Sequence, residues 1–287
     1  MRRYNKIGLA LFISAGLNLL AVVMYLTPRN GTSLYFFDVG QGDAMLIQDS
    51  DGHQVLIDGG PNNKLSSNLE RVMPYGDTTI DAIFISHPHY DHYFGLLNVF
   101  DHYSVGMVVL PRMGSTAVSW KKLLTLLHEK GIPVYVPREN AHIILGDSSL
   151  EVVWPGIINK DVNNSSMVLK FTYHNYSALL MGDAGTLIEP ILLQPKYSAS
   201  LENISLLKVG HHGSKYGSTM AFLKKIAPHD AVISVGEKNR YGHPHQETLT
   251  RLENDTIHIW RTDKQGTVVL QCGSATQCTI HADHSTH

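Results

Sequence analysis

The chain has 287 residues, of which 43% are hydrophobic and 17% charged, and its formal net charge is −2. This length fits one large domain or two small ones, and the balanced charge excludes a global basic field that would hold nucleic acid. The chain uses 17 histidines, a frequency that mildly favours metal chemistry.

The N-terminal segment differs from the rest of the chain. Residues 7–26, IGLALFISAGLNLLAVVMYL, contain no charged side chain. A run of this length can cross a hydrocarbon layer of about 30 Å as one helix. Arg2, Arg3 and Lys6 precede the run, so the positive-inside rule predicts a cytoplasmic tail at 1–6 and a single-pass anchor at 7–26.

This orientation places the remainder of the chain outside the cytoplasm, tethered to the cell membrane. Secretion after cleavage of a signal peptide is the alternative, although no clear cleavage site follows the apolar run. A linker over 27–33 leads into one domain over 34–278. Residues 279–287, which contain three histidines, are expected to be a flexible tail.

The first half of the domain predicts strands alternating with helices. A helix is expected over 64–73, where Leu65, Leu69, Val72 and Met73 share one face. A second is expected over 119–131, where Trp120, Leu123, Leu124 and Leu127 recur at helical spacing. The expected strands are 34–39, 43–48, 53–60, 80–86, 105–111 and 132–137.

The second half predicts both hairpins and strand–helix alternation. Its expected strands are 150–155, 166–173, 176–183, 204–212, 230–236, 257–263 and 266–272, with helices near 218–227 and 245–254. This mixture predicts an α/β fold in which two mixed sheets pack face to face with helices outside, a four-layer αββα sandwich. Cys272 and Cys278 flank a small loop, and a disulfide and two unrelated thiols remain equal alternatives.

Several apolar strands end in polar side chains. The strand at 80–86 leads into His87, His89, Asp91 and His92, and other strands end at Asp58, at Asp183, at His211 and His212, and near Asn239 to His243. Because strands that lie side by side bring their ends to one edge, we expect these side chains to converge.

These residue types suit a pair of metal ions. A Zn²⁺ ion takes about four nitrogen or oxygen ligands, more than one tight loop can supply. His87 and His89 could share one ion, Asp91 and His92 suit a second, and the carboxylate of Asp183 could bridge both.

HPHYDH also matches the HxHxDH signature of the metallo-β-lactamase fold superfamily. The segments FFDVGQGDAMLI, NNSSMVLKFTY, LLKVGHHGSKYGST and VISVGEKNRYGHPHQETLTRL resemble, in order, the metallo-hydrolase domain of ComEC-type DNA-uptake competence proteins over roughly residues 34–270. The resemblance implies two divalent ions, zinc with manganese as the alternative, and hydrolysis of a phosphodiester, with single-stranded DNA as one candidate. No protein partner is indicated.

The resemblance also implies roles for individual residues. The metal ligands would be His87, His89, Asp91, His92, Asp183 and His211, with His212 as the alternative to His211. Asp58 would orient a ligand imidazole by a hydrogen bond. The catalytic set would be Asp91, His212, His243 and Asn164, with His243 facing the leaving group or the phosphate and Asn164 stabilising the developing oxyanion. Lys215 and Arg240 would bind phosphate.

One departure concerns the first ion. Asn163 and Asn164 stand where many members of the superfamily have a histidine. Because an amide is a weak, neutral ligand, we expect the first ion to be held loosely or through a water.

Other readings remain open. The chain could hydrolyse a phosphorylcholine-type or other envelope ester, or be a non-catalytic envelope binding protein. FFDVGQGD can be only a β-hairpin with a glycine turn, so no catalytic role is expected for Asp38 or Asp43, and NRYGHP fits a turn before a helix equally well. Because no multi-span channel is present, a tethered hydrolase is expected rather than a transporter.

Overall fold

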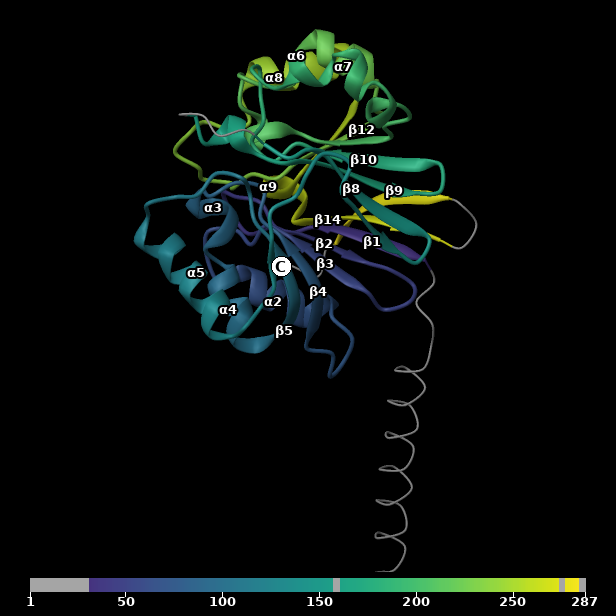
Figure 1. Cartoon of the computed structure of the whole chain (residues 1–287). Coiled ribbons are helices and arrows are strands. Elements are labelled where there is room, and N and C mark those ends of the chain that lie inside the picture. Colours follow the sequence, from purple (N-terminus) through teal and green to yellow (C-terminus); the bar gives the residue numbers. More distant parts are fainter. Residues whose placement is uncertain (1–30, 157–160, 274–276, 284–287) are drawn as a thin grey trace, which may run out of the picture.

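The computed structural model describes residues 31–156, 161–273 and 277–283 (Figure 1). Within these ranges no helix combines the length and the apolar character needed to span a membrane. The expected cytoplasmic tail and the expected anchor at 7–26 lie outside the described residues.

Two mixed sheets form the centre of the molecule (Figure 1). The first has eight strands in the order β15-β14-β1-β2-β3-β4-β5-β6. Its strands are β1 (Thr32–Phe36), β2 (Met45–Gln48), β3 (Gln54–Ile57), β4 (Thr79–Phe84), β5 (Ser104–Val109), β6 (Val134–Tyr135), β14 (Thr267–Cys272) and β15 (Cys278–Asp283). From β3 to β6 the strands are parallel, as their helical or long connections require.

The second sheet has seven strands in the order β13-β12-β11-β10-β9-β8-β7. They are β7 (His142–Leu145), β8 (Ser148–Trp154), β9 (Val168–Tyr173), β10 (Tyr176–Leu180), β11 (Leu206–Lys208), β12 (Asp230–Ile233) and β13 (His258–Arg261). The hairpin expected at His174 joins β9 and β10, whose register pairs Tyr173 with Tyr176. From β10 to β13 the strands are parallel.

Helices cover the outer face of each sheet (Figure 1). The first sheet carries α2 (Lys64–Val72), α3 (Tyr90–Tyr93), α4 (Leu96–His102) and α5 (Val118–Glu129), and the second carries α6 (Glu189–Leu192), α7 (Met220–Ile226) and α8 (Gln246–Asn254). A short α9 (Thr262–Gln265) joins β13 to β14 across the two sheets. Short 3₁₀ segments are η1 (Asn163–Ser165), η2 (Pro195–Tyr197), η3 (Ala199–Leu201) and η4 (Gly210–Gly213).

Three apolar clusters hold the four layers together. The central cluster joins the sheets through side chains such as Phe36 and Phe171. Leu69 and Leu123 belong to the cluster beneath the first helical layer, and Phe222 belongs to the cluster beneath the second. The expected αββα sandwich is confirmed, because amphipathic helices can bury their apolar stripes only on the sheet faces left free by sheet-to-sheet packing.

Two details differ from the expectation. Leu124 lies on the exposed side of α5 with 39% of its surface accessible, since Trp120, Leu123 and Leu127 alone fill the buried stripe. Residues 279–283 are not a tail, because β15 pairs with β14 through Asp283, and a disulfide joins Cys272 to Cys278 within that hairpin.

Candidate metal centre

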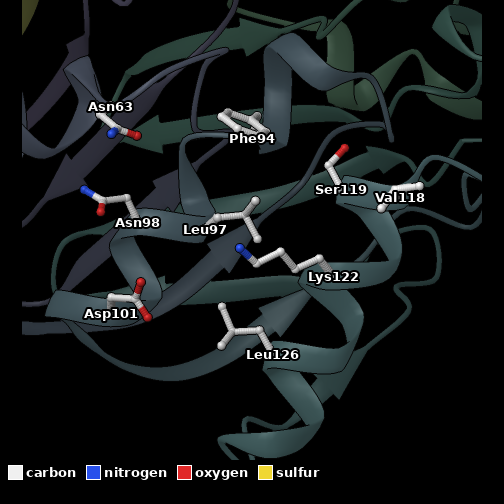
Figure 2. Close-up of a pocket in the computed structure, with 9 residues that line it drawn as sticks. All are labelled: Asn63, Phe94, Leu97, Asn98, Asp101, Val118, Ser119, Lys122 and Leu126. Atoms are coloured by element: carbon white, nitrogen blue, oxygen red, sulfur yellow. The ribbon is translucent and has the colours of Figure 1, made fainter.

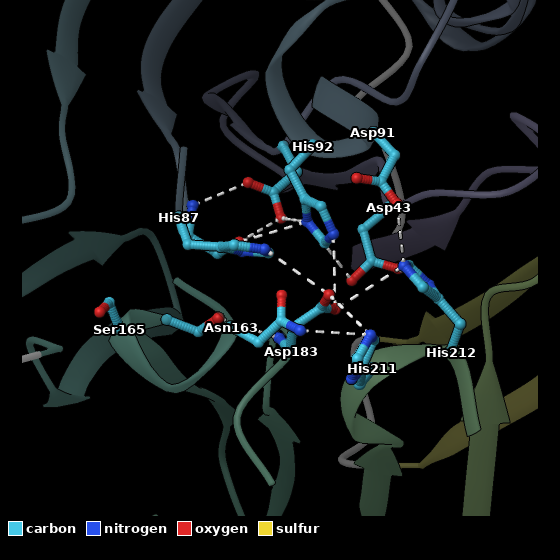
Figure 3. A network of polar contacts seen from close by, with 12 residues as sticks. Asp43, His87, Asp91, His92, Asn163, Ser165, Asp183, His211 and His212 are labelled. Carbon is cyan, nitrogen blue, oxygen red and sulfur yellow. Dashed lines mark hydrogen bonds and ion pairs between the residues drawn. The ribbon is translucent and has the colours of Figure 1, made fainter. Parts of the chain in front are cut away.

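The polar residues that end the strands meet at one edge of the sandwich (Figure 3). Asp58 follows β3 and His87 follows β4 in the first sheet, while Asp183 follows β10 and His211 follows β11 in the second. Because β3 is parallel to β4 and β10 to β11, both pairs point their carboxyl ends the same way. The site therefore spans both sheets.

The loop after β4 separates its four polar residues by their backbone conformations. His87 precedes α3 and is completely buried, whereas His89 is the N-cap residue of α3 and remains half-buried. Asp91 and His92 occupy the first turn of α3, so the helical rotation directs these neighbours differently.

The carboxylate of Asp183 is the centre of the arrangement (Figure 3). Its Oδ1 lies 3.4 Å from Nε2 of His92 and 3.7 Å from Nε2 of His212. Its Oδ2 lies 3.6 Å from Nε2 of His87 and 3.8 Å from Nε2 of His211. Asp183 is thus shared by four imidazoles, as a carboxylate bridging two ions would be.

His211 and His212 occupy different surroundings although they are adjacent. Both residues have left-handed backbones, with φ of 49° and 53°, a conformation uncommon outside glycine and often found at functional sites. His212 is buried, and its Nε2 lies 3.4 Å from Oδ2 of Asp91. His211 is partly exposed, and its Nε2 lies 3.4 Å from Nδ2 of Asn163. His212 therefore lies beside Asp91 and His92, in the position that the sequence first assigned to His211.

A carboxylate behind His92 orients that ring. Asp58 has a left-handed backbone (φ 59°) that turns its side chain toward the loop after β4. Its oxygens accept hydrogen bonds from the backbone N–H of Ser86 (2.7 Å), from Oγ of Ser86 (2.7 Å) and from Nδ1 of His92 (2.8 Å). Asp58 therefore lies next to the imidazole of His92, one of the expected ligands.

A second buried carboxylate, Asp43, was not expected here. Its Oδ1 lies 3.4 Å from Nδ1 of His212, and its Oδ2 accepts a hydrogen bond from Nζ of Lys208. The sequence assigned Asp43 to a glycine-rich turn. A lysine inside the apolar run LLKVG was the available signal, because a buried lysine needs a charged partner.

The electrostatics of the site favour positive charge. Burial opposes protonation of His92, yet the carboxylates of Asp183 and Asp58 outweigh it and hold the pKa of His92 well above its usual value. Burial acts in the same way on His212, where Asp183 and Asp43 raise the pKa to about 10. Burial would raise the pKa of Asp183, but His92 and His212 hold it well below its usual value. Such a site is electrostatically prepared to hold divalent cations.

The donor atoms also fit metal ions. Nε2 of His87, His92 and His212 and Oδ1 of Asp183 are buried and have no hydrogen-bond partner in the described part of the chain. Two ligands of one zinc ion stand at most about 4 Å apart, twice a bond of about 2.0–2.2 Å. The distances of 3.4 to 3.8 Å around Asp183 satisfy this limit, and two groups, His87–His92–Asp183 and Asp91–His92–His212, place their ligand atoms within 4.8 Å of one another.

A cavity of about 180 Å³ opens over these donors. It is lined by Gln41, His89, Asp91, Asn163, Asp183, His211, His212, Tyr241 and His243. Asn163 lines the cavity, whereas the amide nitrogen of Asn164, the residue expected to stabilise the oxyanion, donates to the carboxylate of Asp161. Asn163 Oδ1 is buried without a hydrogen-bond partner among the described residues.

His243 lies at the cavity wall as expected. Its ring centroid stands 5.3 Å from that of His211 and 6.3 Å from that of His212. Partial burial, with the neighbouring imidazoles of His211 and His212, lowers the pKa of His243 to about 4. His243 is therefore a neutral imidazole near pH 7.

The two expected phosphate-binding cations stand just outside the cavity lining. The guanidinium of Arg240 lies 5.1 Å from the ring centroid of Tyr241 and donates to its hydroxyl. Nζ of Lys215 lies 5.5 Å from the ring centroid of Tyr216. Both cations are exposed, so they can reach a substrate only on the outer side of the cavity.

A larger hollow of about 780 Å³ lies between α4 and α5 (Figure 2). Its lining residues, Asn63, Phe94, Leu97, Asn98, Asp101, Val118, Ser119, Lys122 and Leu126, include no histidine or cysteine. Asp101 is the one carboxylate in this lining, so the smaller cavity, where histidines and carboxylates converge, is the candidate site.

Comparison with curated proteins identifies relatives named for competence and recombination. ComE operon protein 3 of Bacillus subtilis (strain 168) is 30% identical over 253 residues, which cover 80% of this chain and 32% of that protein. Competence protein ComA of Neisseria gonorrhoeae is 27% identical over 256 residues, 86% of this chain and 33% of that protein. Recombination protein 2 of Haemophilus influenzae is 26% identical over 238 residues, which cover 80% of this chain and 28% of that protein. The chain spans about a third of the length of these relatives, and the resemblance to ComEC-type proteins is confirmed.

Solved structures confirm the fold. The metallo-beta-lactamase fold protein YhfI from Bacillus subtilis superposes with a TM-score of 0.56 at 12% identity, covering 88% of this chain and all of the other. Zn²⁺-bound PqqB from Methylobacterium extorquens superposes with a TM-score of 0.52 at 9% identity, covering 77% of this chain and 85% of the other. At these identities the likeness establishes only the fold.

The sequence pattern of the metallo-beta-lactamase superfamily matches residues 37–237, from the end of β1 to the loop that follows β12. Proteins with this fold are typically metal-dependent hydrolases that bind divalent ions, often two, and the donor atoms around Asp183 agree with that chemistry. Because the match covers more than half of its residues, this chain belongs to the metallo-beta-lactamase superfamily.

Proposed function

We propose that this protein is a metal-dependent phosphodiesterase that acts on DNA. The observation that supports this most directly is the sharing of the Asp183 carboxylate by four imidazoles, with contacts of 3.4 to 3.8 Å. Relatives whose names refer to competence and recombination favour DNA over other phosphodiesters, with single-stranded DNA as the first substrate to test.

The donor atoms form two sets, one for each of two divalent ions. Zinc is the first candidate for these ions and manganese the second. His87 and His89, with one oxygen of Asp183, are the set for the first ion. Asp91, His92 and His212, with the other oxygen of Asp183, are the set for the second. When bound, such ions polarise a phosphoryl oxygen and lower the pKa of a coordinated water to about 7.

The remaining residues of the cavity bind and orient the substrate. Asn163 can donate its amide N–H to a phosphate oxygen from the side of His211. His243, a neutral imidazole with a lowered pKa, can donate one ring N–H to the leaving-group oxygen. Tyr241 extends the cavity wall outward, and Arg240 and Lys215 can hold the next phosphates along a strand.

The full-length chain, purified in detergent and loaded with zinc or manganese, tests this proposal. The substrates are labelled single-stranded DNA, double-stranded DNA, bis-p-nitrophenyl phosphate and p-nitrophenylphosphorylcholine. We expect cleavage of the DNA, and we expect Asp183→Ala to lower turnover at least about 100-fold, because it removes the ligand shared by both ions and with it the charge stabilisation that the ions would supply. Asp147→Ala, at an exposed turn between β7 and β8, is the matched control.

Other outcomes separate the rival functions. Turnover of the phosphorylcholine ester without DNA cleavage would favour an envelope ester hydrolase. A native chain that binds no metal and cleaves none of the substrates would contradict the proposal and favour a non-catalytic binding protein.

We also propose that the hydrolase domain is tethered to the cell membrane with its active site outside the cytoplasm. The uncharged run at 7–26 and the three basic residues before it support this. Carbonate extraction and protease accessibility in intact spheroplasts test it. Release of the chain by carbonate, or its protection in intact spheroplasts, would contradict the proposed arrangement.

A further inference from the structure

Lys208 is the one lysine or arginine that is buried among the described residues. It ends β11, a central strand of the second sheet, and its side chain is inaccessible to solvent. Its ammonium group donates to Oδ2 of Asp43, which is equally buried. Burying two charges costs several kcal/mol per ion before their attraction offsets it, so a simple packing role does not explain the choice of these residues.

Asp43 stands directly behind the second ligand set. Its Oδ1 lies 3.4 Å from Nδ1 of His212, and its Oδ2 lies 4.0 Å from Nδ1 of His92. Asp43 therefore acts mainly on His212, because Nδ1 of His92 already donates to Asp58.

The backbone of Asp43 is fixed to two other parts of the site. Its N–H donates to the carbonyl oxygen of Asp91 (3.2 Å), and its carbonyl oxygen accepts from the N–H of Gly60 (2.8 Å). Gly42 makes this approach possible, because a Cβ atom there would lie 2.3 Å from the carbonyl oxygen of Asp91. A displacement of Asp43 would therefore move Asp91 as well as the imidazole of His212.

We infer that the Lys208–Asp43 ion pair positions His212 for the second ion, an inference that rests on the proposed metal-dependent function. A carboxylate at Nδ1 favours the tautomer in which Nδ1 carries the proton and the Nε2 lone pair faces the ion. The carbonyl oxygen of Ser234, 3.0 Å from Nδ1 of His212, selects the same tautomer. Asp43 adds the negative charge that strengthens the imidazole as a ligand.

Lys208 has a separate task in this arrangement. An oxygen of Asp43 lies within 4.8 Å of a carboxylate oxygen of Asp183 and of a ring nitrogen of His212, so a small shift of its side chain would let Asp43 compete as a ligand. The ammonium group of Lys208 binds that carboxylate from the interior and keeps it in the supporting position. Lys208 and Asp43 are thus positioning residues that neither line the cavity nor touch the substrate.

The test compares the full-length native protein with Lys208→Met, Asp43→Asn and the double variant. The double variant replaces the ion pair with neutral groups of similar shape, a change that folded proteins often tolerate. Lys170→Met, on β9 of the same sheet, is the control, because Lys170 contacts the carbonyl oxygen of Glu202 and no metal ligand. The measured quantities are the two zinc dissociation constants by chelator competition and the melting temperature of the metal-free protein.

We expect the double variant to bind the second zinc about 10- to 100-fold more weakly, the usual effect of losing a partner of a metal ligand. The first zinc should bind as in the native protein. Lys208→Arg, which keeps the positive charge beside Asp43, should retain most of the native affinity for the second zinc. A merely structural role would weaken both ions together in step with the melting temperature, and that result would overturn the inference. Native affinities at both sites in the double variant would overturn it as well.

A failure of the proposed function would give a different result from a failure of this inference. If the native chain binds no zinc, the metal centre itself is wrong. If the native chain binds two ions and the ratio of their affinities is the same in every folded variant, only the role of Lys208 and Asp43 is wrong.

Discussion

Asp58 accepts a hydrogen bond from Nδ1 of His92 across 2.8 Å, while Nε2 of the same ring lies 3.4 Å from Oδ1 of Asp183. The ring is therefore held from behind by one carboxylate and presented to another. Asp58 does not line the cavity, so its contribution is to fix the orientation and tautomer of His92.

The first prediction concerns this contact. Asp58→Asn keeps the shape of the side chain but removes the charge that supports His92, and we expect the second zinc ion to bind about 10- to 100-fold more weakly. Chelator competition measures the change. Asp101→Asn, at an exposed position on α4, should leave both zinc affinities unaltered, and an equal loss in the two variants would contradict the role of Asp58.

The second prediction separates two adjacent amides. Asn163 lines the cavity, whereas the amide of Asn164 is bonded to Asp161. We expect Asn163→Ala to lower kcat about 100-fold if its N–H stabilises the developing charge. Asn164→Ala should cost about 1 kcal/mol of unfolding free energy, the net value of a typical hydrogen bond, and leave kcat nearly native. The reverse pattern in single-turnover assays would restore the role first expected for Asn164.

The sequence predicted those parts of the site that local patterns encode. HPHYDH and the polar ends of the parallel strands indicated the candidate ligands, because apolar runs of this kind place their ends at one sheet edge. Asp43 and Lys208 were missed because they are 165 residues apart, with Asp43 in the loop before β2 of the first sheet and Lys208 at the end of β11 in the second. Spacing also could not separate His211 from His212, since only the left-handed backbone at both residues decides which ring faces Asp91.

The third prediction concerns this histidine pair. His212 is buried beside Asp91 and Asp183, so His212→Ala should reduce the zinc content of the purified chain from two ions toward one. His211 is partly exposed and contacts Asn163, so His211→Ala should retain the second ion. Elemental analysis of both proteins after dialysis gives the comparison. Loss of the second ion from His211→Ala alone would reverse the assignment.

The fourth prediction concerns pH. The pKa of His212 is about 10 in the native protein, above the value of about 6.5 expected when unfolded. The native state therefore binds more protons between these values, and the resulting stability is fully present below about pH 6.5 and lost as the pH rises through about 10. The pKa of His92 is also raised in the native protein, so His92 contributes to stability in the same direction. We expect the melting temperature of the metal-free protein to fall over this range.

Bound zinc should abolish this fall in the melting temperature. Metal-bound imidazoles are neutral and remain so across the range, which means that zinc binding releases protons at the lower pH values. Calorimetric melts at pH 6, 8 and 10, with a chelator or with zinc, test both statements. His212→Gln should flatten the profile of the metal-free protein, and an unchanged slope in this variant would show that other groups cause the fall.

The last prediction concerns the outer side of the cavity. Arg240 and Lys215 are exposed and pack against Tyr241 and Tyr216, so they can hold phosphates of a strand whose cleaved bond lies at the metal centre. Replacing both with Gln should raise KM for single-stranded DNA several-fold and reduce the dependence of KM on salt, because each lost cation removes about one phosphate contact. kcat should stay near native, since neither residue lines the cavity.

The control is Lys224→Gln/Lys225→Gln, on the exposed side of α7, which removes the same charge elsewhere and should leave KM unaltered. If both double variants raise KM equally, DNA responds to overall charge, and Arg240 and Lys215 do not form a phosphate-binding site.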